Sequence, residues 1–239
     1  MYDDSKKDSR TSAERLEASV LEESAVTPPD KIRLLLVDDH VVVRQGLNMV
    51  LSLEPDLDIV GEAGNGKEAL EQVAKLEPQV VLMDLLMPVM DGISAIRAIK
   101  KDYPDIEVVA LTSVREDRLV IDAVEAGAAG YLLKESGPGE LVEAIRAAAK
   151  GEVRLHPKAQ KRLVKEVRTP EMRESLTERE TETLRLVAKG HANKDVAERM
   201  GVSEVTVKTH VSSILSKLNL SSRTQAALFA LKEGIVGLE

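Results

Sequence analysis

The sequence predicts an α/β domain with a doubly wound, five-stranded parallel sheet, followed by a second, all-α domain of four helices. From Ile32 to about residue 150, short apolar runs alternate with segments of helical period. The runs are apolar throughout, a pattern typical of parallel strands that helices cover on both faces. After Gly151 the strand-like runs end and only helical periods remain. These observations predict the two fold classes and their order along the chain.

The composition limits the classes of protein that the chain can belong to. Its 239 residues suffice for two ordinary domains, and 43% hydrophobic with 31% charged residues is a globular composition. The absence of cysteine excludes disulfides and thiolate sites and favours a reducing cytoplasm. The chain has no apolar run of transmembrane length and no signal-peptide core after Met1, so we expect a cytoplasmic protein without a membrane partner.

Net charge differs between the segments of the chain. The total of −8 by itself argues against a nucleic-acid partner. The acidic surplus lies in residues 1–150, however, whereas residues 151–170 carry +4 and residues 171–239 are neutral. Residues 193–223 carry a local net charge of +2. A basic surplus this small does not by itself indicate a nucleic-acid partner.

The same patterns predict the limits of each segment. Residues 1–30 are polar and end in Thr27-Pro28-Pro29-Asp30, which predicts a flexible N-terminal tail. Residues 151–175 are expected to be a basic linker, partly helical between His156 and Arg168, and residues 176–239 the all-α domain. Residues 31–150 are expected to form the α/β domain, with strands near 32–37, 57–62, 79–84, 106–111 and 129–132 and helices near 41–53, 65–76, 93–102, 115–126 and 138–150.

Capping residues divide the last 60 or so residues into helices. Thr177 and Glu180 have the spacing of a capping box, which predicts the start of a first helix. Ser203 is placed to cap a long third helix. The remaining signals are an end of the first helix at Gly190, a cap of the second at Asn193, a tight turn at Gly201 and a fourth helix from Ser221 to about Glu233.

Chemically active side chains follow four of the five predicted strands. Asp38-Asp39 follow the first strand and Asp84 ends the third, so three carboxylates should surround one crevice of a doubly wound sheet. Such a cluster needs a cation, and an all-oxygen site selects Mg²⁺ or a similar hard ion. The fourth strand ends in Thr112, which adds a hydroxyl group. The fifth strand is followed by Lys134, which adds an ammonium group. Together these groups predict a phosphoryl pocket in which an aspartate is the acceptor.

These residues lie in motifs that resemble the receiver domain of two-component response regulators, which has a flavodoxin-like fold. The motifs are Leu36-Val37-Asp38-Asp39-His40, Met83-Asp84-Leu85-Leu86-Met87-Pro88-Val89-Met90-Asp91-Gly92, Leu111-Thr112-Ser113 and Gly130-Tyr131-Leu132-Leu133-Lys134. The resemblance implies that Asp84 accepts a phosphoryl group from a sensor histidine kinase. It also implies Mg²⁺ on Asp39, Asp84 and the Leu86 carbonyl, with Asp38 helping through water. Thr112 and Tyr131 would move inward as switch residues, and Lys134 would pair with the phosphoryl group.

A competing interpretation is a phosphatase of the haloacid-dehalogenase type, which also uses an aspartate at a strand end. That chemistry requires an acid two residues after the nucleophile. The residue in that position is Leu86. The sequence therefore favours the receiver and not an enzyme.

The long third helix of the all-α domain has two contrasting faces. A 3.6-residue period places Val207, Val211, Ile214, Leu215 and Leu218 on one face. The opposite face is small and hydroxyl-rich near the helix start, and it consists of Val205, Thr206, Thr209, Ser212 and Ser216. Such a face suits a DNA major groove, but an ordinary amphipathic helix with a wet polar side fits the pattern equally well.

A second resemblance favours the DNA-reading helix over the ordinary amphipathic helix. Leu176-Thr177-Glu178-Arg179-Glu180, Gly190-His191-Ala192-Asn193-Lys194-Asp195-Val196-Ala197 and Ser203-Glu204-Val205-Thr206-Val207-Lys208-Thr209-His210-Val211 resemble the LuxR-type helix-turn-helix effector of the NarL/FixJ subfamily. A ligand-sensing LuxR protein would have another N-terminal domain where this chain has its receiver. The resemblance implies base contacts from Lys208, Thr209 and Ser212, and phosphate contacts from Lys194, Ser203, Thr206, Lys217 and Arg223.

The two resemblances together imply a transcription regulator of a two-component system that binds double-stranded promoter DNA. Phosphorylation would shift the receiver and promote homodimerisation. We expect the dimer to use the first helix, at Val41 and Val42, and the small residues Ala144, Ala147, Ala148 and Ala149 of the fifth. The competing surface lies around 115–125. The alternative function is a phosphorylation-independent regulator whose receiver is a protein-docking module.

Overall fold

The computed structural model describes residues 31–113, 117–153 and 174–237. The predicted tail, the linker helix at 156–168 and the start of the helix predicted from residue 115 lie outside these residues. In residues 31–153 the strands are β1 (Ile32–Val37), β2 (Leu57–Ala63), β3 (Val80–Asp84), β4 (Glu107–Thr112) and β5 (Gly130–Leu133), and the helices are α2 (Val41–Leu51), α3 (Gly66–Leu76), α4 (Gly92–Asp102), α5 (Asp117–Ala126) and α6 (Pro138–Ala149).

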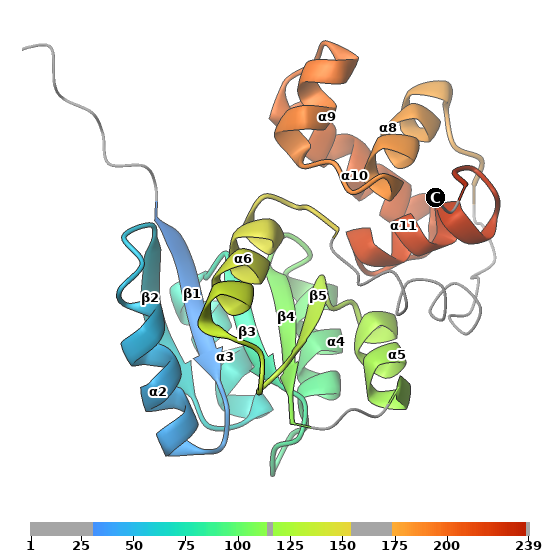
Figure 1. The fold of residues 1–239 in the computed structure, drawn as a ribbon. Helices are drawn as coiled ribbons and strands as arrows, with labels where there is room; N and C mark the ends of the chain where they lie inside the picture. Colours follow the sequence, from blue (N-terminus) through green and yellow to red (C-terminus); the bar gives the residue numbers. More distant parts are fainter. Residues whose placement is uncertain (1–30, 114–116, 154–173, 238–239) are drawn as a thin grey trace, which may run out of the picture. The chain divides into compact units, whose positions relative to one another are not determined.

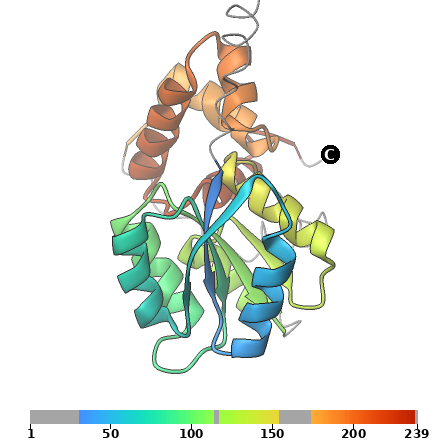
Figure 2. The same cartoon turned by 90° about the vertical axis from the view of Figure 1, so that its left-hand side faces the viewer.

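Within the described residues the strands form one five-stranded parallel sheet in the order β2-β1-β3-β4-β5. Helices α2 and α6 cover one face, and α3, α4 and α5 cover the other (Figures 1 and 2). Because successive side chains of a strand point to opposite faces, Leu34 and Leu36 enter one core while Leu35 and Val37 enter the other. The doubly wound α/β fold predicted from the sequence is confirmed.

A close backbone approach fixes the start of α4 beside the end of β3. The N–H of Gly92 donates a hydrogen bond to the Leu85 carbonyl at 3.0 Å. A Cβ at residue 92 would lie only 2.0 Å from the carbonyl oxygen of Asp84, so this position requires glycine. Asp91 caps the helix by accepting a hydrogen bond from the Ser94 N–H at 2.8 Å. The segment from Asp84 to α4 is thereby held in one conformation.

Four helices lie in the described residues 174–237: α8 (Glu178–Ala188), α9 (Asn193–Met200), α10 (Glu204–Leu218) and α11 (Arg223–Lys232). The capping box of Thr177 and Glu180 and the cap at Ser203 are confirmed. The cap predicted at Asn193 is wrong: the N-cap of α9 is Ala192, because the Asn193 Oδ1 accepts from the Arg223 Nη1 at 2.7 Å. The fourth helix starts later than predicted, with Ser222 as its cap.

The buried stripe predicted for the long third helix is present in α10. Val207, Ile214 and Leu218 are buried, and Val211 and Leu215 pack partly buried against the same helical cores. The opposite side of the helix therefore remains available to a partner.

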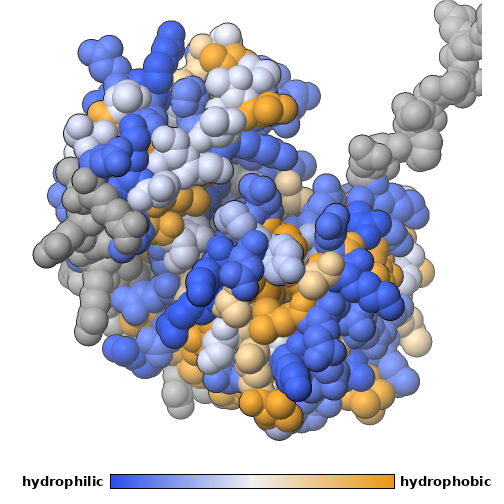
Figure 3. Space-filling view, turned by 180° about the vertical axis from the view of Figure 1, so that it is seen from behind, coloured by the Kyte–Doolittle hydropathy of each residue, from blue (hydrophilic) through white to orange (hydrophobic). Residues whose placement is uncertain are grey.

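No helix among the described residues is long and apolar enough to cross a membrane. On the face seen in Figure 3, hydrophilic residues predominate and hydrophobic ones form smaller patches between them. Scattered apolar surface of this kind is normal for folded proteins.

Candidate phosphoryl site and nucleic-acid interface

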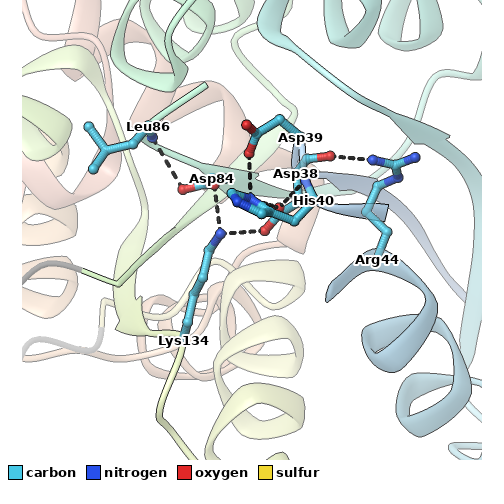
Figure 4. A network of polar contacts seen from close by, with 7 residues as sticks. All are labelled: Asp38, Asp39, His40, Arg44, Asp84, Leu86 and Lys134. Carbon is cyan, nitrogen blue, oxygen red and sulfur yellow. Dashed lines mark hydrogen bonds and ion pairs between the residues drawn. The ribbon is translucent and has the colours of Figure 1, made fainter. Parts of the chain in front are cut away.

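Two of the three carboxylates predicted at the strand ends, those of Asp38 and Asp84, meet around the ammonium group of Lys134 (Figure 4). Asp38 follows β1 and Asp84 ends β3, and both side chains are buried. Lys134, just after β5, places its Nζ 2.6 Å from the Asp38 Oδ2 and 2.6 Å from the Asp84 Oδ2. The Leu86 N–H donates to the Asp84 Oδ1 at 3.2 Å. Asp84 is thus oriented from two sides.

Burial and charge act in opposite directions on these groups. Burial raises the pKa of Asp84 above its ordinary value, although Lys134 and the Leu86 N–H oppose the change. Burial alone would lower the pKa of Lys134, but its hydrogen bonds to Asp38 and Asp84 raise it. Lys134 is therefore a firmly positive group inside the pocket, suited to neutralise oxygens of a phosphoryl group.

The donor set of the pocket suits a divalent cation. Asp38, Asp39, His40 and Asp84 each offer a ligand atom, and these atoms all lie within 4.8 Å of one another. Three of the four are carboxylates, which a hard ion such as Mg²⁺ prefers. The residues present therefore fit the ion predicted from the sequence.

Two residues of this site were not identified from the sequence. The Nδ1 of His40 lies 2.7 Å from the Asp39 Oδ1. Arg44 in α2 donates to the Asp38 carbonyl at 2.5 Å and to the Glu62 Oε2 at 3.2 Å, so it fixes the turn that carries the carboxylates. The position of His40 directly after Asp38-Asp39 was a usable signal, whereas that of Arg44 depends on how α2 packs.

The two predicted switch residues lie on adjacent strands. Thr112 ends β4 and is fully buried, and its carbonyl accepts a hydrogen bond from the Lys134 N–H at 2.8 Å. Tyr131 of β5 pairs in register with Ala110, two residues before Thr112, and packs partly buried against the core. Their predicted movement remains a prediction.

The predicted base-reading residues lie on the exposed side of α10. Lys208, Thr209 and Ser212 are exposed, as is Lys194 at the start of α9. Ser203 is exposed and Thr206 is half-buried, and their hydroxyl oxygens lie 2.9 Å apart. These side chains are accessible to a partner, and their DNA contacts stay predictions.

Two other residues predicted to bind phosphates are engaged with other parts of the same helical domain. The Lys217 Nζ lies 2.8 Å from the Glu180 Oε2, and the Arg223 guanidinium donates to Asn193 and to the His191 carbonyl at 2.7 Å each. Both cations keep further N–H donors, so phosphate contacts by them also stay predictions.

Glu180 joins the first helix of this domain to the long third one. Besides its part in the capping box, it accepts hydrogen bonds from Ser213 at 2.6 Å and Lys217 at 2.8 Å, both in α10. Burial by itself would raise the pKa of Glu180, but Lys217, Ser213 and Thr177 outweigh it and lower the pKa to about 2. The charged form of Glu180 therefore holds α10 against α8.

Glu180→Gln should lower the free energy of unfolding by about 2 kcal/mol at neutral pH, since a buried charged acceptor is lost. The measurement is urea unfolding of the full chain, followed by circular dichroism. Because the folded pKa of Glu180 is lowered, its contribution is present above about pH 4.5 and is lost as the pH falls towards 2. Glu182→Gln is the control, because Glu182 is exposed and contacts Arg179 of its own helix. Equal effects of both substitutions would contradict the assignment.

The chain matches two known protein families, one over each half. Residues 34–146 match the response regulator receiver domain, and residues 174–230 match the bacterial regulatory proteins of the luxR family. The transcriptional regulatory protein LiaR of Bacillus subtilis (strain 168) is 44% identical over 209 residues, which cover 86% of this chain and 99% of LiaR. The chain therefore belongs to the LuxR-type response regulators of two-component systems. It is a DNA-binding regulator and not an enzyme.

Two solved structures are similar to the chain, one over little more than half of its length and one over most of it. A two-component response regulator of the LuxR family from Aurantimonas sp. SI85-9A1 is 34% identical, with a TM-score of 0.53, and the match covers 57% of this chain and 97% of that one. A structure of two RcsB dimers bound to two parallel DNAs is 26% identical, with a TM-score of 0.50, over 87% of this chain and 100% of that one.

Proposed function

We propose that Asp84 is the phospho-acceptor through which a sensor histidine kinase controls this regulator. The observation that carries the proposal is the buried Asp84 carboxylate held 2.6 Å from Lys134 at the carboxyl edge of the sheet. A carboxylate oxygen of Asp84 attacks the phosphorus, and the kinase histidine leaves. Lys134 then pairs with the transferred group.

The same carboxylates form the proposed site for a divalent cation. Asp39, Asp84 and the Leu86 carbonyl would hold Mg²⁺, with Asp38 in support. The ion supplies neutralisation of the phosphoryl oxygens. Asp38 and Asp39 would serve the cation alone, whereas Asp84, although also a ligand, would keep one carboxylate oxygen for the attack on phosphorus.

Labelling with acetyl phosphate tests this assignment. The acyl phosphate is trapped by borohydride reduction and located by mass spectrometry. We expect the label on Asp84 alone, and a label on Asp38 or Asp39 would overturn the proposal.

The phosphoryl group adds negative charge at the end of β3, and Thr112 and Tyr131 respond by moving inward. The receiver shifts towards a population that dimerises and binds promoter DNA. On the DNA, Lys208, Thr209 and Ser212 contact bases, and the phosphate contacts come from Lys194, Ser203, Thr206, Lys217 and Arg223. The cytoplasmic location and the domain limits at residues 31, 151 and 176 are part of the same proposal.

The proposed dimer uses α2, and of the four alanines expected in α6 only Ala144 and Ala149 remain accessible. Ala147 and Ala148 are each only 4% exposed, and Ala148 packs in the core beneath α6, so they offer no surface to a second copy. In α2 and just after it, Val42, Met49 and Leu53 are 80%, 73% and 79% exposed. Their spacing of seven and four residues places them on one side of the helix, which forms an apolar stripe. A two-fold interface built on this stripe would cover it.

Val42→Asp should keep the phosphorylated protein monomeric, because a charge buried in an apolar interface loses its solvation. Sedimentation of the acetyl-phosphate-treated protein measures this. Arg118→Ala on the competing surface is the control. Val120, in contrast, is buried, so substituting it would disturb the fold itself. The α2 interface is wrong if Val42→Asp still dimerises while Arg118→Ala does not.

A further inference from the structure

An exposed apolar side chain lies on the side of α10 that carries the predicted base-reading residues. Val205 is 73% exposed and is the second residue of α10, two positions after the N-cap Ser203. Residues 205, 209, 212 and 216 follow one another at intervals of four, three and four, so they lie along one side of the helix. All four are exposed. Val205 therefore begins the stripe that contains Thr209 and Ser212.

A hydrogen bond within the helix makes the first half of this stripe still less polar. The Thr209 hydroxyl donates to the Val205 carbonyl at 3.0 Å. A threonine has one O–H donor, and here that donor is used by the backbone. What Thr209 offers a partner is its methyl group and the remaining acceptor capacity of its oxygen. Along this stripe, Val205 and Thr209 therefore present methyl groups, and the next hydroxyl donor is that of Ser212.

The major groove of DNA contains one matching apolar group. Among the four bases only thymine carries a methyl group, at C5, and apolar side chains contact it. In helix-turn-helix proteins the N-terminal residues of the recognition helix contact base edges. An exposed valine on its own is normal, but this one lies at the helix start and on the side predicted to face the bases.

We propose that Val205 is a specificity-determining residue that packs against the C5-methyl group of a thymine in the bound DNA. This inference rests on the proposed DNA-binding orientation of α10. It adds a reader of an A·T pair to the polar contacts assigned to Lys208, Thr209 and Ser212.

Deoxyuridine differs from thymidine only in lacking the C5-methyl group, and every hydrogen-bonding atom stays in place. Replacing thymidine by deoxyuridine therefore tests the contact with the methyl group alone. A preferred duplex is first selected from a random pool with the full-length, acetyl-phosphate-treated protein. Each thymine of that duplex is then replaced singly by deoxyuridine. At one position the replacement should weaken wild-type binding about four-fold, the effect of one buried methyl group.

The variant Val205→Ala should bind the thymine duplex about four-fold more weakly than the wild type and show no further loss with deoxyuridine at that position. Ser216→Ala, at the far end of the same stripe, should respond to deoxyuridine as the wild type does. Circular dichroism confirms that each variant is folded.

Two results would overturn the inference while leaving DNA binding intact. In the first, deoxyuridine does not change the affinity of the wild type at any position. In the second, Val205→Ala loses as much affinity as the wild type when the thymine methyl group is removed. If the wild type selects no sequence at all, the DNA-binding orientation fails as well.

Discussion

Asp84→Asn is expected to abolish Mg²⁺-dependent phosphorylation by acetyl phosphate. The amide nitrogen of asparagine is not a nucleophile, and in the proposed site Asp38 and Asp39 are committed to the cation. Phosphate-affinity electrophoresis of the treated protein measures the labelled fraction directly.

Asp91→Asn is a matched control for this experiment. Asp91 lies in the same segment between β3 and α4, is exposed and caps α4. Asparagine caps helices as well as aspartate does, so this substitution should leave both the fold and the labelling intact. Labelling of Asp84→Asn at the wild-type level would show that the phospho-acceptor is another residue.

The phosphoryl group on Asp84 is expected to last on the order of hours and not seconds, because rapid hydrolysis requires a positioned water. Leu86 lies two residues after the acceptor, and its side chain cannot hydrogen-bond a water. The second position expected to steer water is Val114, which lies outside the described residues. The rate of loss of label from purified phosphoprotein measures the lifetime.

Leu86→Asn provides the complementary variant, because its amide can hold a water near the phosphorus. We expect it to shorten the lifetime about ten-fold or more. A wild-type half-life of seconds without any phosphatase, or an unchanged lifetime in Leu86→Asn, would show that Leu86 does not limit hydrolysis.

The α/β fold and the carboxylate pocket were predictable because the signals are local. The parallel strands are apolar runs, and the reactive groups follow directly at their ends. Once the strand order is fixed, Asp38, Asp84 and Lys134 meet without any further packing information. The capping box at Thr177 is local in the same sense.

The errors arose where tertiary contacts override a local pattern. Asn193 has the composition of a helix cap, but Arg223, 30 residues away, binds its side chain. Ala147 and Ala148 were expected at a surface because small residues permit close approach, yet they are buried. The ion pair of Glu180 with Lys217 joins residues 37 apart, and no spacing rule predicts it.

The central claim is that a phosphoryl group on Asp84 controls DNA binding. The most direct test measures the affinity of the protein for a selected duplex before and after acetyl-phosphate treatment, at a fixed salt concentration. Fixed salt matters because phosphate contacts make the affinity salt-dependent. For the wild type we expect treatment to raise the affinity about ten-fold, and for Asp84→Asn we expect no change. Equal affinity of treated and untreated wild type, at full labelling, would contradict the account and favour a receiver that serves only as a protein-docking module.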